Sequence, residues 1–386
     1  MRFVCVLLLL GCTSAAPPGI KDAGLATPVE VALPAGVDAS KPEKLVAFCA
    51  GKEVPFQIAD GKAVFLVNDK PGIHVLQSGT PKDFPKVEVR DVDGKQLLVS
   101  YGGKTIFRYN YGTIKPPEGV DPVFERSGYI HPIWTPSGKV VTNDSPKNHL
   151  HHHGLWAAWT SSEFEGRKSN FWESKEKQGK IECVKVERTF SGPVFGGFRA
   201  KHRFINLNGP GGPKAALEEI WDVRVWAIAD HFVFDLVSTQ TCATEHPLVI
   251  KEYRYGGIGF RGSGEWEGKE GAAFLTSEGK TRKDGHATKA RWCVMSGKVA
   301  GADCSIGFLG HPSDFRYPQP MRIHPDEPFF NWAVPQGGDF SIEPGKPYVS
   351  RYRFVVADGA LSTDVMDRLQ KAYAEPPLVT LGASDR

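Results

Sequence analysis

No two cysteines of the chain stand in a C-x-x-C spacing, although the sequence contains seven cysteines. Cys5 and Cys12 belong to the N-terminal leader, and the five others are far apart along the chain. An odd number of widely spaced cysteines argues against a zinc ribbon and against a disulfide scaffold. We therefore expect these five cysteines to lie in strands as small hydrophobic residues, or Cys293 and Cys304 to bridge a hairpin.

A strong net charge is also missing. The 386 residues include 47 Lys and Arg and 44 Asp and Glu, which gives a formal net charge of +3 with the signs interspersed. Such a chain has no long-range field to steer it onto a nucleic acid, so DNA and RNA binding are not expected. With 41% hydrophobic and 24% charged residues, the composition excludes wholesale disorder.

The apolar run at the start of the chain is too short to cross a bilayer. It covers residues 4–10, against the roughly 20 residues that a spanning helix needs. With Arg2 before it and small residues after it, the run predicts an export signal in residues 1–16. Residues 9–12 (LLGC) look like a lipoprotein box, in which Cys12 carries a lipid anchor, and cleavage near Ala15 is the alternative. We expect an exported protein that is periplasmic, an outer-membrane lipoprotein or extracellular.

Glycine and proline are abundant, with 42 and 29 residues, and no alternation of strands with helices is visible. Many turns indicate many short strands, so the sequence predicts an all-β protein. Short alternating segments in residues 25–100 predict a small β-sandwich, and longer aromatic strands predict a large antiparallel β domain in residues 101–375. Within it, residues 220–226 and 231–237 predict a hairpin. Residues 361–373 have the N-cap and spacing of one short helix, and residues 376–386 are expected to form a loose tail.

Five of the twelve histidines fall between residues 131 and 153. In an extended segment, His149, His151 and His153 would share one face while His152 faces away. Imidazoles at this spacing suit zinc, copper, iron or nickel, so we expect a divalent metal of unknown identity. His131 or His324 would complete the ligand shell. A solvated or internally hydrogen-bonded loop is the alternative.

The polar and aromatic residues around this segment are typical of a carbohydrate site. Aromatic faces stack on the apolar faces of sugar rings, and charged groups bind sugar hydroxyls. Three residues are candidates for catalysis, namely His152, Glu252 and Tyr255. Five are candidates for binding the substrate, namely Arg126, Arg167, Trp172, Arg261 and Asn331, and among these Arg126 and Arg167 would hold acidic groups.

Several catalytic motifs are missing. The glycines of residues 251–261 do not have the G-x-G-x-x-G spacing before a helix, and no P-loop, G-x-S-x-G or H-E-x-x-H occurs. A nucleotide site is therefore not expected.

The order of the motifs resembles a known bacterial family. The segments HPIWTPSG (131–138), NDSP (143–146), HLHHHGL (149–155), FEGRK (164–168) and EYRYGGIGFR (252–261) look like the family named "methane oxygenase PmoA" over about residues 105–356. The resemblance implies an exported, mostly β protein. More weakly, residues 340–354 are similar to the closing strands of galactose-mutarotase-like proteins, which implies that the large domain is a supersandwich that binds sugars on a concave sheet.

Three functions follow from these patterns. The first is an exported carbohydrate-active enzyme, a lyase or hydrolase, with a metal held by His131, His149, His151, His153 and His324. In this reading Tyr255 or His152 moves the proton and Glu252 positions it. The second is a copper- or iron-dependent oxygenase, as the family name suggests. The third is an envelope sugar-binding protein without catalysis. The expected partner is a carbohydrate or another small polar substrate.

Overall fold

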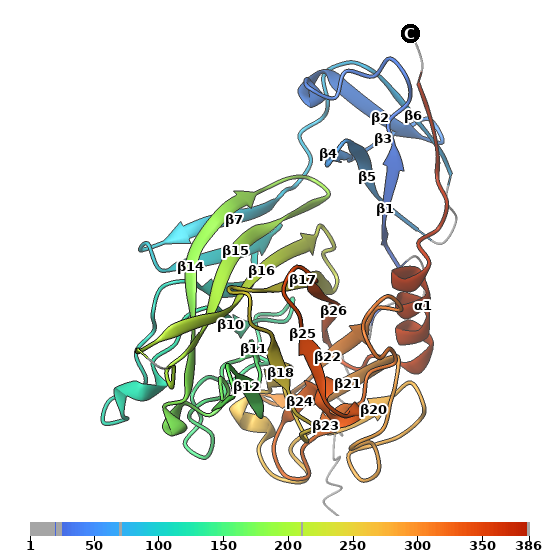
Figure 1. The fold of residues 1–386 in the computed structure, drawn as a ribbon. Helices are drawn as coiled ribbons and strands as arrows, with labels where there is room; N and C mark the ends of the chain where they lie inside the picture. Colours follow the sequence, from blue (N-terminus) through green and yellow to red (C-terminus); the bar gives the residue numbers. More distant parts are fainter. Residues whose placement is uncertain (1–19, 21–24, 69–71, 210, 384–386) are drawn as a thin grey trace, which may run out of the picture.

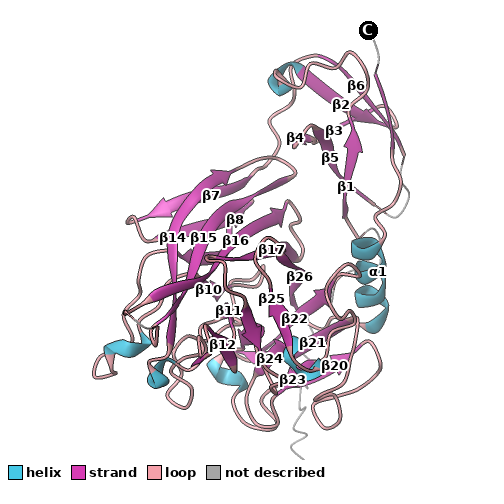
Figure 2. Cartoon of the chain, in the orientation of Figure 1, coloured by secondary structure: helices cyan, strands magenta, loops and turns pink. Residues whose placement is uncertain are grey.

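The computed structural model describes residues 20, 25–68, 72–209 and 211–383 (Figure 1). The predicted export signal, including Cys12, lies outside these residues. The chain is built mostly of antiparallel strands with one α-helix near its C-terminus, as Figure 2 shows by colour. The predicted all-β class is confirmed. Within the described residues, no helix is long and apolar enough to span a membrane.

The largest sheet, here the long sheet, has eight antiparallel strands. The predicted hairpin forms its centre, where Trp221 pairs with Ser238 and Val225 with Phe234. Side chains alternate between buried and less buried positions along these strands, as a period of two requires. In spatial order the strands are β14 (Gly179–Phe190), β15 (Phe195–Asn206), β16 (Lys214–Trp226), β17 (Phe232–Cys242), β26 (Tyr348–Asp358), β22 (Ala302–Gly310), β21 (Trp292–Val299) and β20 (Ala273–Thr276).

A second antiparallel sheet, here the site sheet, also has eight strands. In spatial order these are β23 (Met321–Ile323), β24 (Phe329–Trp332), β19 (Gly257–Arg261), β11 (Leu155–Ala158), β10 (Tyr129–Ile133), β9 (Lys104–Asn110), β8 (Gln96–Tyr101) and β7 (Val87–Val92).

The two sheets pack face to face over an aromatic core. The ring centroids of Phe107 and Phe234 are 5.2 Å apart, and those of Phe308 and Phe330 are 4.3 Å apart. Each of these pairs joins one strand of the site sheet to one strand of the long sheet, so inward-facing residues of both sheets form one continuous core. This is the predicted large β-sandwich.

Short elements surround one end of the sandwich. A four-stranded sheet there is made of β13 (Arg167–Ser169), β12 (Ser162–Phe164), β18 (Leu248–Ile250) and β25 (Phe340–Ile342). The chain also contains the 3₁₀ helices η1 (Pro42–Lys44), η2 (Pro122–Phe124), η3 (Ser174–Glu176), η4 (Gly264–Trp266) and η5 (Val334–Gly337).

The N-terminal module is a small β structure, as expected, and lies at one end of the molecule in Figure 1. Its two sheets enclose a core that includes Ala47, Phe65 and Leu76. One sheet contains β1 (Thr27–Ala32), β5 (Lys62–Val67) and β4 (Gln57–Ala59). The other contains β27 (Thr380–Ala383), β6 (Ile73–Ser78), β2 (Leu45–Cys49) and β3 (Lys52–Val54).

Two predicted boundaries of this module need correction. Strand β8 pairs with β7 on one side and with β9 on the other, so both β7 and β8 belong to the site sheet and the boundary at residue 100 falls within that sheet. The connection instead runs through residues 79–86, where Pro81 and Pro85 interrupt strand pairing. The tail is not loose throughout, because β27 pairs in parallel with β6 and satisfies its backbone groups there.

The predicted helix is confirmed as α1 (Thr363–Ala374). The hydroxyl of Ser362 accepts a hydrogen bond from the backbone N–H of Val365 at 3.3 Å, which caps the first turn. Val365, Met366 and Leu369 are buried, and they pack against the face of the long sheet opposite to the main core.

All five described cysteines lie in strands as free residues, as expected. The alternative prediction, a disulfide between Cys293 and Cys304 across a hairpin, is wrong. Cys293 pairs with Phe308 and Cys304 with Gly297 across β21 and β22, so the two side chains are out of register.

Candidate functional site

The histidine segment consists of tight turns and is not extended. The backbone N–H of His149 donates to the carbonyl of Pro146 at 2.9 Å, and that of His152 donates to the carbonyl of His149 at 2.9 Å. Strand β11 begins only at Leu155. The predicted alternation of faces is therefore wrong: His149, His151 and His152 border one cleft, and His153 does not.

His131 and His153 belong to a separate polar network. Nδ1 of His153 lies 2.7 Å from Oδ1 of Asp144, and Nδ1 of His131 lies 2.9 Å from Oγ1 of Thr142. The Tyr129 hydroxyl donates to Oδ2 of Asp144 at 2.8 Å. Burial lowers the pKa of both histidines, although the charge of Asp144 opposes this effect. This network holds the segment before β11 in place.

The five predicted metal ligands are thus not brought together. His149, His151 and His324 border one cleft, while the other two ligands make the hydrogen bonds given above. In the part of the chain that the structure describes, no three His, Cys, Asp or Glu side chains are arranged to hold a metal ion. The residues do not fit the expected five-ligand centre, and the divalent metal stays a prediction from the sequence.

The cleft has a volume of about 300 Å³. Five segments form it: η2, the turns of residues 147–152, the region of η3, the loop between β18 and β19, and residues 322–329 from β23 to the start of β24. They are far apart in sequence and converge because β11, β19, β24 and β23 are neighbours in the site sheet. A cleft of this size accommodates a small polar molecule.

His151 is oriented by a carboxylate that also lines the cleft. Its Nδ1 lies 3.1 Å from Oε2 of Glu173, and Oε1 of Glu173 accepts from the backbone N–H of Lys175 in η3. Burial alone would raise the pKa of the Glu173 carboxyl. The hydrogen bond and charge of His151, together with Lys175, outweigh burial and lower this pKa. A carboxylate partner fixes the proton on Nδ1, so Nε2 of His151 is an acceptor.

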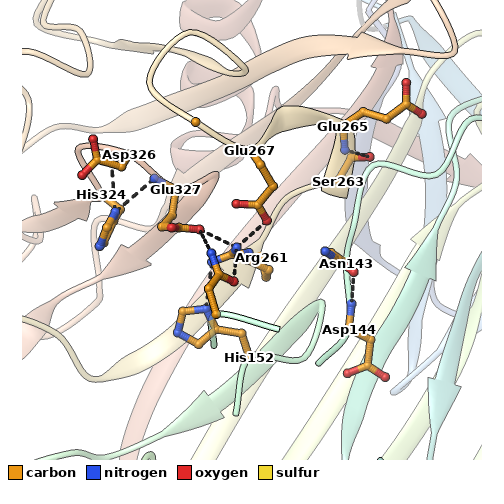
Figure 3. Close-up of polar contacts among 12 residues, drawn as sticks. Asn143, Asp144, His152, Arg261, Ser263, Glu265, Glu267, His324, Asp326 and Glu327 are labelled. Atoms are coloured by element: carbon orange, nitrogen blue, oxygen red, sulfur yellow. Dashed lines mark hydrogen bonds and ion pairs between the residues drawn. The ribbon is translucent and has the colours of Figure 1, made fainter. Parts of the chain in front are cut away.

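His324 has the opposite tautomer. Its Nδ1 accepts hydrogen bonds from the backbone N–H groups of Asp326 at 3.2 Å and Glu327 at 3.0 Å. Burial and the charge of Arg322 lower the pKa of His324 to about 4, so the ring is neutral at pH 7. With Nδ1 accepting, the ring proton lies on Nε2 and His324 is a donor. The contacts of this histidine are drawn in Figure 3.

Between these two groups, His149 and His152 form a stack. Their ring centroids are 4.6 Å apart with an interplanar angle of 14°, and His152 stacks in turn on Phe329 at 4.8 Å. Burial, and then the charges of neighbouring His and Arg residues, lower the pKa of His152 well below its usual value. Within the described residues, Nδ1 of His149 has no hydrogen-bond partner. His152 is therefore a neutral wall residue, and His149 offers an unused polar atom.

Trp172 lies beneath the cleft and does not line it. It is 1% exposed and packs against Trp156 at 5.0 Å and Tyr255 at 5.2 Å. This position does not support its predicted contact with substrate, because its ring is covered by other aromatic residues. Tyr255 does line the cleft, and burial together with Tyr253 raises its pKa to about 12. At neutral pH Tyr255 is a donor of hydrogen bonds.

Arg261 is completely buried and holds the cleft wall together. Its guanidinium pairs with Glu267 and, at 2.5 Å, with Glu327, and it donates to Nδ1 of His152 at 3.3 Å (Figure 3). It also donates to Asn148 at 3.2 Å. These contacts use the charge that we expected to bind substrate, so Arg261 supports the turn and the 324–327 loop from below.

Four other predicted residues lie outside the cleft. Asn331 is buried and bonds backbone groups of β19, accepting from Gly256 N–H at 3.0 Å and donating to the carbonyl of Ile258 at 2.6 Å. Arg126 is buried and donates to the carbonyl of Ala157 at 2.9 Å. Glu252 and Arg167 are exposed on the surface. Glu252 lies in the loop after β18, and Arg167 is the first residue of β13. Their predicted roles in substrate binding and proton positioning are not supported by these positions.

Sequence reasoning missed the partner of His151 and most of the charged lining. Glu173, Arg254 and Arg322 border the cleft, together with Lys147 and Lys175. The only sequence signal for Arg254 is its position beside Tyr255 in the aromatic segment 251–261. Glu173 follows Trp172, but a single glutamate after a buried tryptophan carries no information about its partner.

A family model described as "Family of unknown function (DUF6807)" matches residues 96–371. This range contains the whole cleft. The model states no activity, so the resemblance to the methane oxygenase family stays a prediction. No curated protein matches the sequence.

Solved structures with similar folds have low identity to the chain. A candidate aldose 1-epimerase from Klebsiella pneumoniae subsp. pneumoniae is 11% identical, with a TM-score of 0.32 over 82% of this chain and 91% of that one. Heparan sulfate lyase HepC from Pedobacter heparinus is 9% identical, with a TM-score of 0.29 over 74% of this chain and 38% of that one. A galactose mutarotase related enzyme from Lactobacillus acidophilus is 7% identical, with a TM-score of 0.30 over 71% of this chain and 100% of that one. The chain thus spans well under half of the lyase.

Proposed function

The chain belongs to the family of unknown function DUF6807, and from this premise we propose that its cleft is the active site of a carbohydrate lyase. His151 is the general base, and His324 donates a hydrogen bond to the charge that develops on the substrate. The observation that carries this proposal is a pair of histidines that border one cleft, with Nδ1 of His151 against a carboxylate and Nδ1 of His324 accepting from two backbone N–H groups.

The base is supported by its partner. Nδ1 of His151 is held by Glu173, so Nε2 has a free lone pair, and the carboxylate stabilises the imidazolium that forms when the ring takes a proton. A base positioned in this way contributes a factor of about 10²–10⁴ to the rate of proton transfer. Export and a metal are expectations from the sequence, and no step of the proposed reaction needs a metal.

The reaction is written as a carbon deprotonation followed by elimination. Nε2 of His151 takes the proton from a carbon next to a carbonyl or carboxyl group, and the C–H electron pair moves into that group. Nε2–H of His324 donates to the oxygen that gains charge. The pair then returns to form a carbon–carbon double bond while the β-oxygen leaves, and Tyr255, which is protonated at neutral pH, supplies a proton to that oxygen.

The lining favours elimination over hydrolysis. Glycosidases use two carboxyl groups that flank the scissile bond. Among the described residues that line the cleft, Glu173 is the one residue with a carboxylate, and this carboxylate already contacts Nδ1 of His151. The aromatic rings of Phe329 and Tyr255 border the same space, and such rings stack on sugar faces. A lyase needs a base and a donor, and both are present.

Deuterium exchange tests the proposal. The protein is incubated in D₂O with oligosaccharides that contain uronic acids, and the loss of the substrate C–H signal and the growth of vinyl signals are followed by ¹H NMR. We expect both changes, and we expect His151→Gln to slow them by a factor on the order of 10²–10⁴.

His246→Gln is the matched control, because His246 is largely exposed and lies outside the cleft. It should react at the wild-type rate. Release of saturated sugars without vinyl signals would show that the protein is a hydrolase and not a lyase. Equal rates for His151→Gln and wild type would remove His151 from the reaction.

A further inference from the structure

We infer that the cleft selects a sugar that carries a carboxylate, and that Arg254 and Arg322 bind this group. The inference rests on the proposed function and adds to it the class of substrate. It follows from charges that face the cleft without a counter-ion.

Four cationic side chains line the cleft, and the hydrogen bonds and ring contacts of these side chains are with neutral groups, although the charge of Lys175 acts on Glu173. Arg254 lies over the rings of Tyr253 at 5.8 Å and Tyr255 at 5.4 Å. Arg322 donates to Nε2 of His286 at 3.2 Å. Of the lysines, Lys175 lies over Phe124 at 5.6 Å, and Lys147 is exposed. Within the described residues, no ion pair of 4.0 Å or less joins any of these four to a carboxylate.

Some arginines elsewhere in the protein are paired with carboxylates, whereas others, such as Arg108 and Arg188, lie over aromatic rings. Arg353 makes two hydrogen bonds to Asp235 at 2.6 and 2.8 Å, and Arg199 bonds Asp222 at 2.6 Å. Arg254 and Arg322 differ from these arginines because both line one cleft, so their like charges act on each other. Burial and then the charge of Arg254 lower the pKa of Arg322. An anionic ligand between the two guanidinium groups would offset these like charges.

The positions of the arginines place the anion beside the donor. Arg322 lies in β23 and His324 follows two residues later, so alternation along the strand directs both side chains to one side. Both residues line the cleft. A carboxylate bound by Arg322 would thus lie next to Nε2–H of His324. The carbon attached to this carboxylate carries the proton that His151 removes.

This arrangement favours a uronic acid over a neutral sugar. Removal of the proton next to a carboxylate puts a second negative charge on that group, which is prohibitive without nearby cations. Two guanidinium groups and one N–H donor supply compensation where the charge develops. Arginine forks also match the planar carboxylate with paired hydrogen bonds.

Isothermal titration with D-glucuronate, D-glucose and D-glucose 6-sulfate tests the inference. We expect the wild-type protein to bind glucuronate at least about tenfold more tightly than glucose, and the difference to shrink with added salt. Arg322→Gln and Arg254→Gln should each weaken glucuronate binding by about tenfold or more and leave glucose binding unchanged. Thermal melting of each variant verifies that it is folded.

Arg167→Gln is the matched control, because this arginine is exposed on β13 outside the cleft and should not affect binding. Equal affinities for glucuronate and glucose would overturn the inference, as would tighter binding of the sulfate ester. Since titration needs no turnover, selective glucuronate binding without deuterium exchange would overturn the proposed reaction alone. Deuterium exchange on a neutral sugar would overturn the inferred preference for a carboxylate and leave the proposed reaction standing.

Discussion

Nδ1 of His151 lies 3.1 Å from Oε2 of Glu173, and this contact joins the turn before β11 to the 3₁₀ helix η3. The same carboxylate accepts from the backbone N–H of Lys175. Glu173 thereby fixes both its own position and the tautomer of the proposed base. It is a positioning residue, since the substrate would contact His151.

Glu173→Gln is expected to slow deuterium exchange by about ten- to a hundredfold. The amide keeps the size of the side chain but removes the negative charge that stabilises the imidazolium. The loss should fall on kcat and leave KM nearly unchanged, because the carboxylate is used by His151. Steady-state NMR assays at several substrate concentrations separate the two constants. Glu176→Gln, an exposed neighbour in η3, is the control. An effect confined to KM would assign Glu173 to substrate binding instead.

The tautomers of His151 and His324 can be observed directly. We expect long-range ¹⁵N–¹H correlation spectra at pH 7.5 to show a protonated Nδ1 for His151 and a protonated Nε2 for His324, because the former faces a carboxylate and the latter accepts two backbone N–H groups. His324→Gln and His151→Gln assign the signals. The low pKa of His324, about 4, predicts that its spectrum stays unchanged down to pH 5.5. The same tautomer for both rings would contradict the mechanism.

Trp172 is expected to act on stability and not on binding. Its ring is buried against Trp156 and Tyr255, so Trp172→Ala should lower the free energy of unfolding by about 3–5 kcal/mol. Urea denaturation measures this loss. Trp134→Ala should cost less, because that ring is partly exposed and faces Arg108. If Trp172→Ala left stability unchanged but weakened glucuronate binding, Trp172 would be a substrate-binding residue, as the sequence predicted.

Much of the scaffold is predictable from the sequence because it depends on local patterns. Alternation of apolar residues identifies β16 and β17, and the N-cap at Ser362 with apolar spacing identifies α1. The patterns do not say which sheet a strand joins. Strands β7 and β8 therefore look like part of the N-terminal module, although β7 pairs with β8 and β8 with β9 in the site sheet.

The site is predictable only in part, because its geometry depends on turns and on distant pairing. The cluster of histidines identifies the correct segment, but the backbone of Ser145 has φ of 49° and the residues after Pro146 form turns, which breaks the alternation that an extended strand would have. Glu173 reaches His151 only through the fold. Phe329 lines the cleft and Trp172 does not, although both are buried aromatic residues whose ring centroids lie 5.9 Å apart.

Another histidine–carboxylate pair lies in the core, where it affects stability. Nδ1 of His202 is 3.0 Å from Oε2 of Glu219, and Nε2 of His202 is 2.6 Å from the hydroxyl of Tyr109. Ser238 and Gln240 donate to the other oxygen of Glu219 at 2.6 and 2.8 Å. Burial opposes the charge of His202, but hydrogen bonds that His202 makes with Cys183 and Glu219, and the charge of Glu219, outweigh burial and raise the pKa of His202 to about 9.

This pair predicts that the protein loses stability in alkali. The pKa of His202 is raised from 6.5 to about 9 on folding, so its contribution is complete below pH 6.5 and is lost as the pH rises through about 9. The shift corresponds to a contribution on the order of 3 kcal/mol. We expect the free energy of unfolding, measured with urea from pH 6 to 10, to fall for wild type relative to the double variant His202→Gln, Glu219→Gln. The double variant removes both charges together, because a single change would leave one buried charge unpaired. A difference between the two proteins that stays constant with pH would mean that His202 is neutral in the folded state.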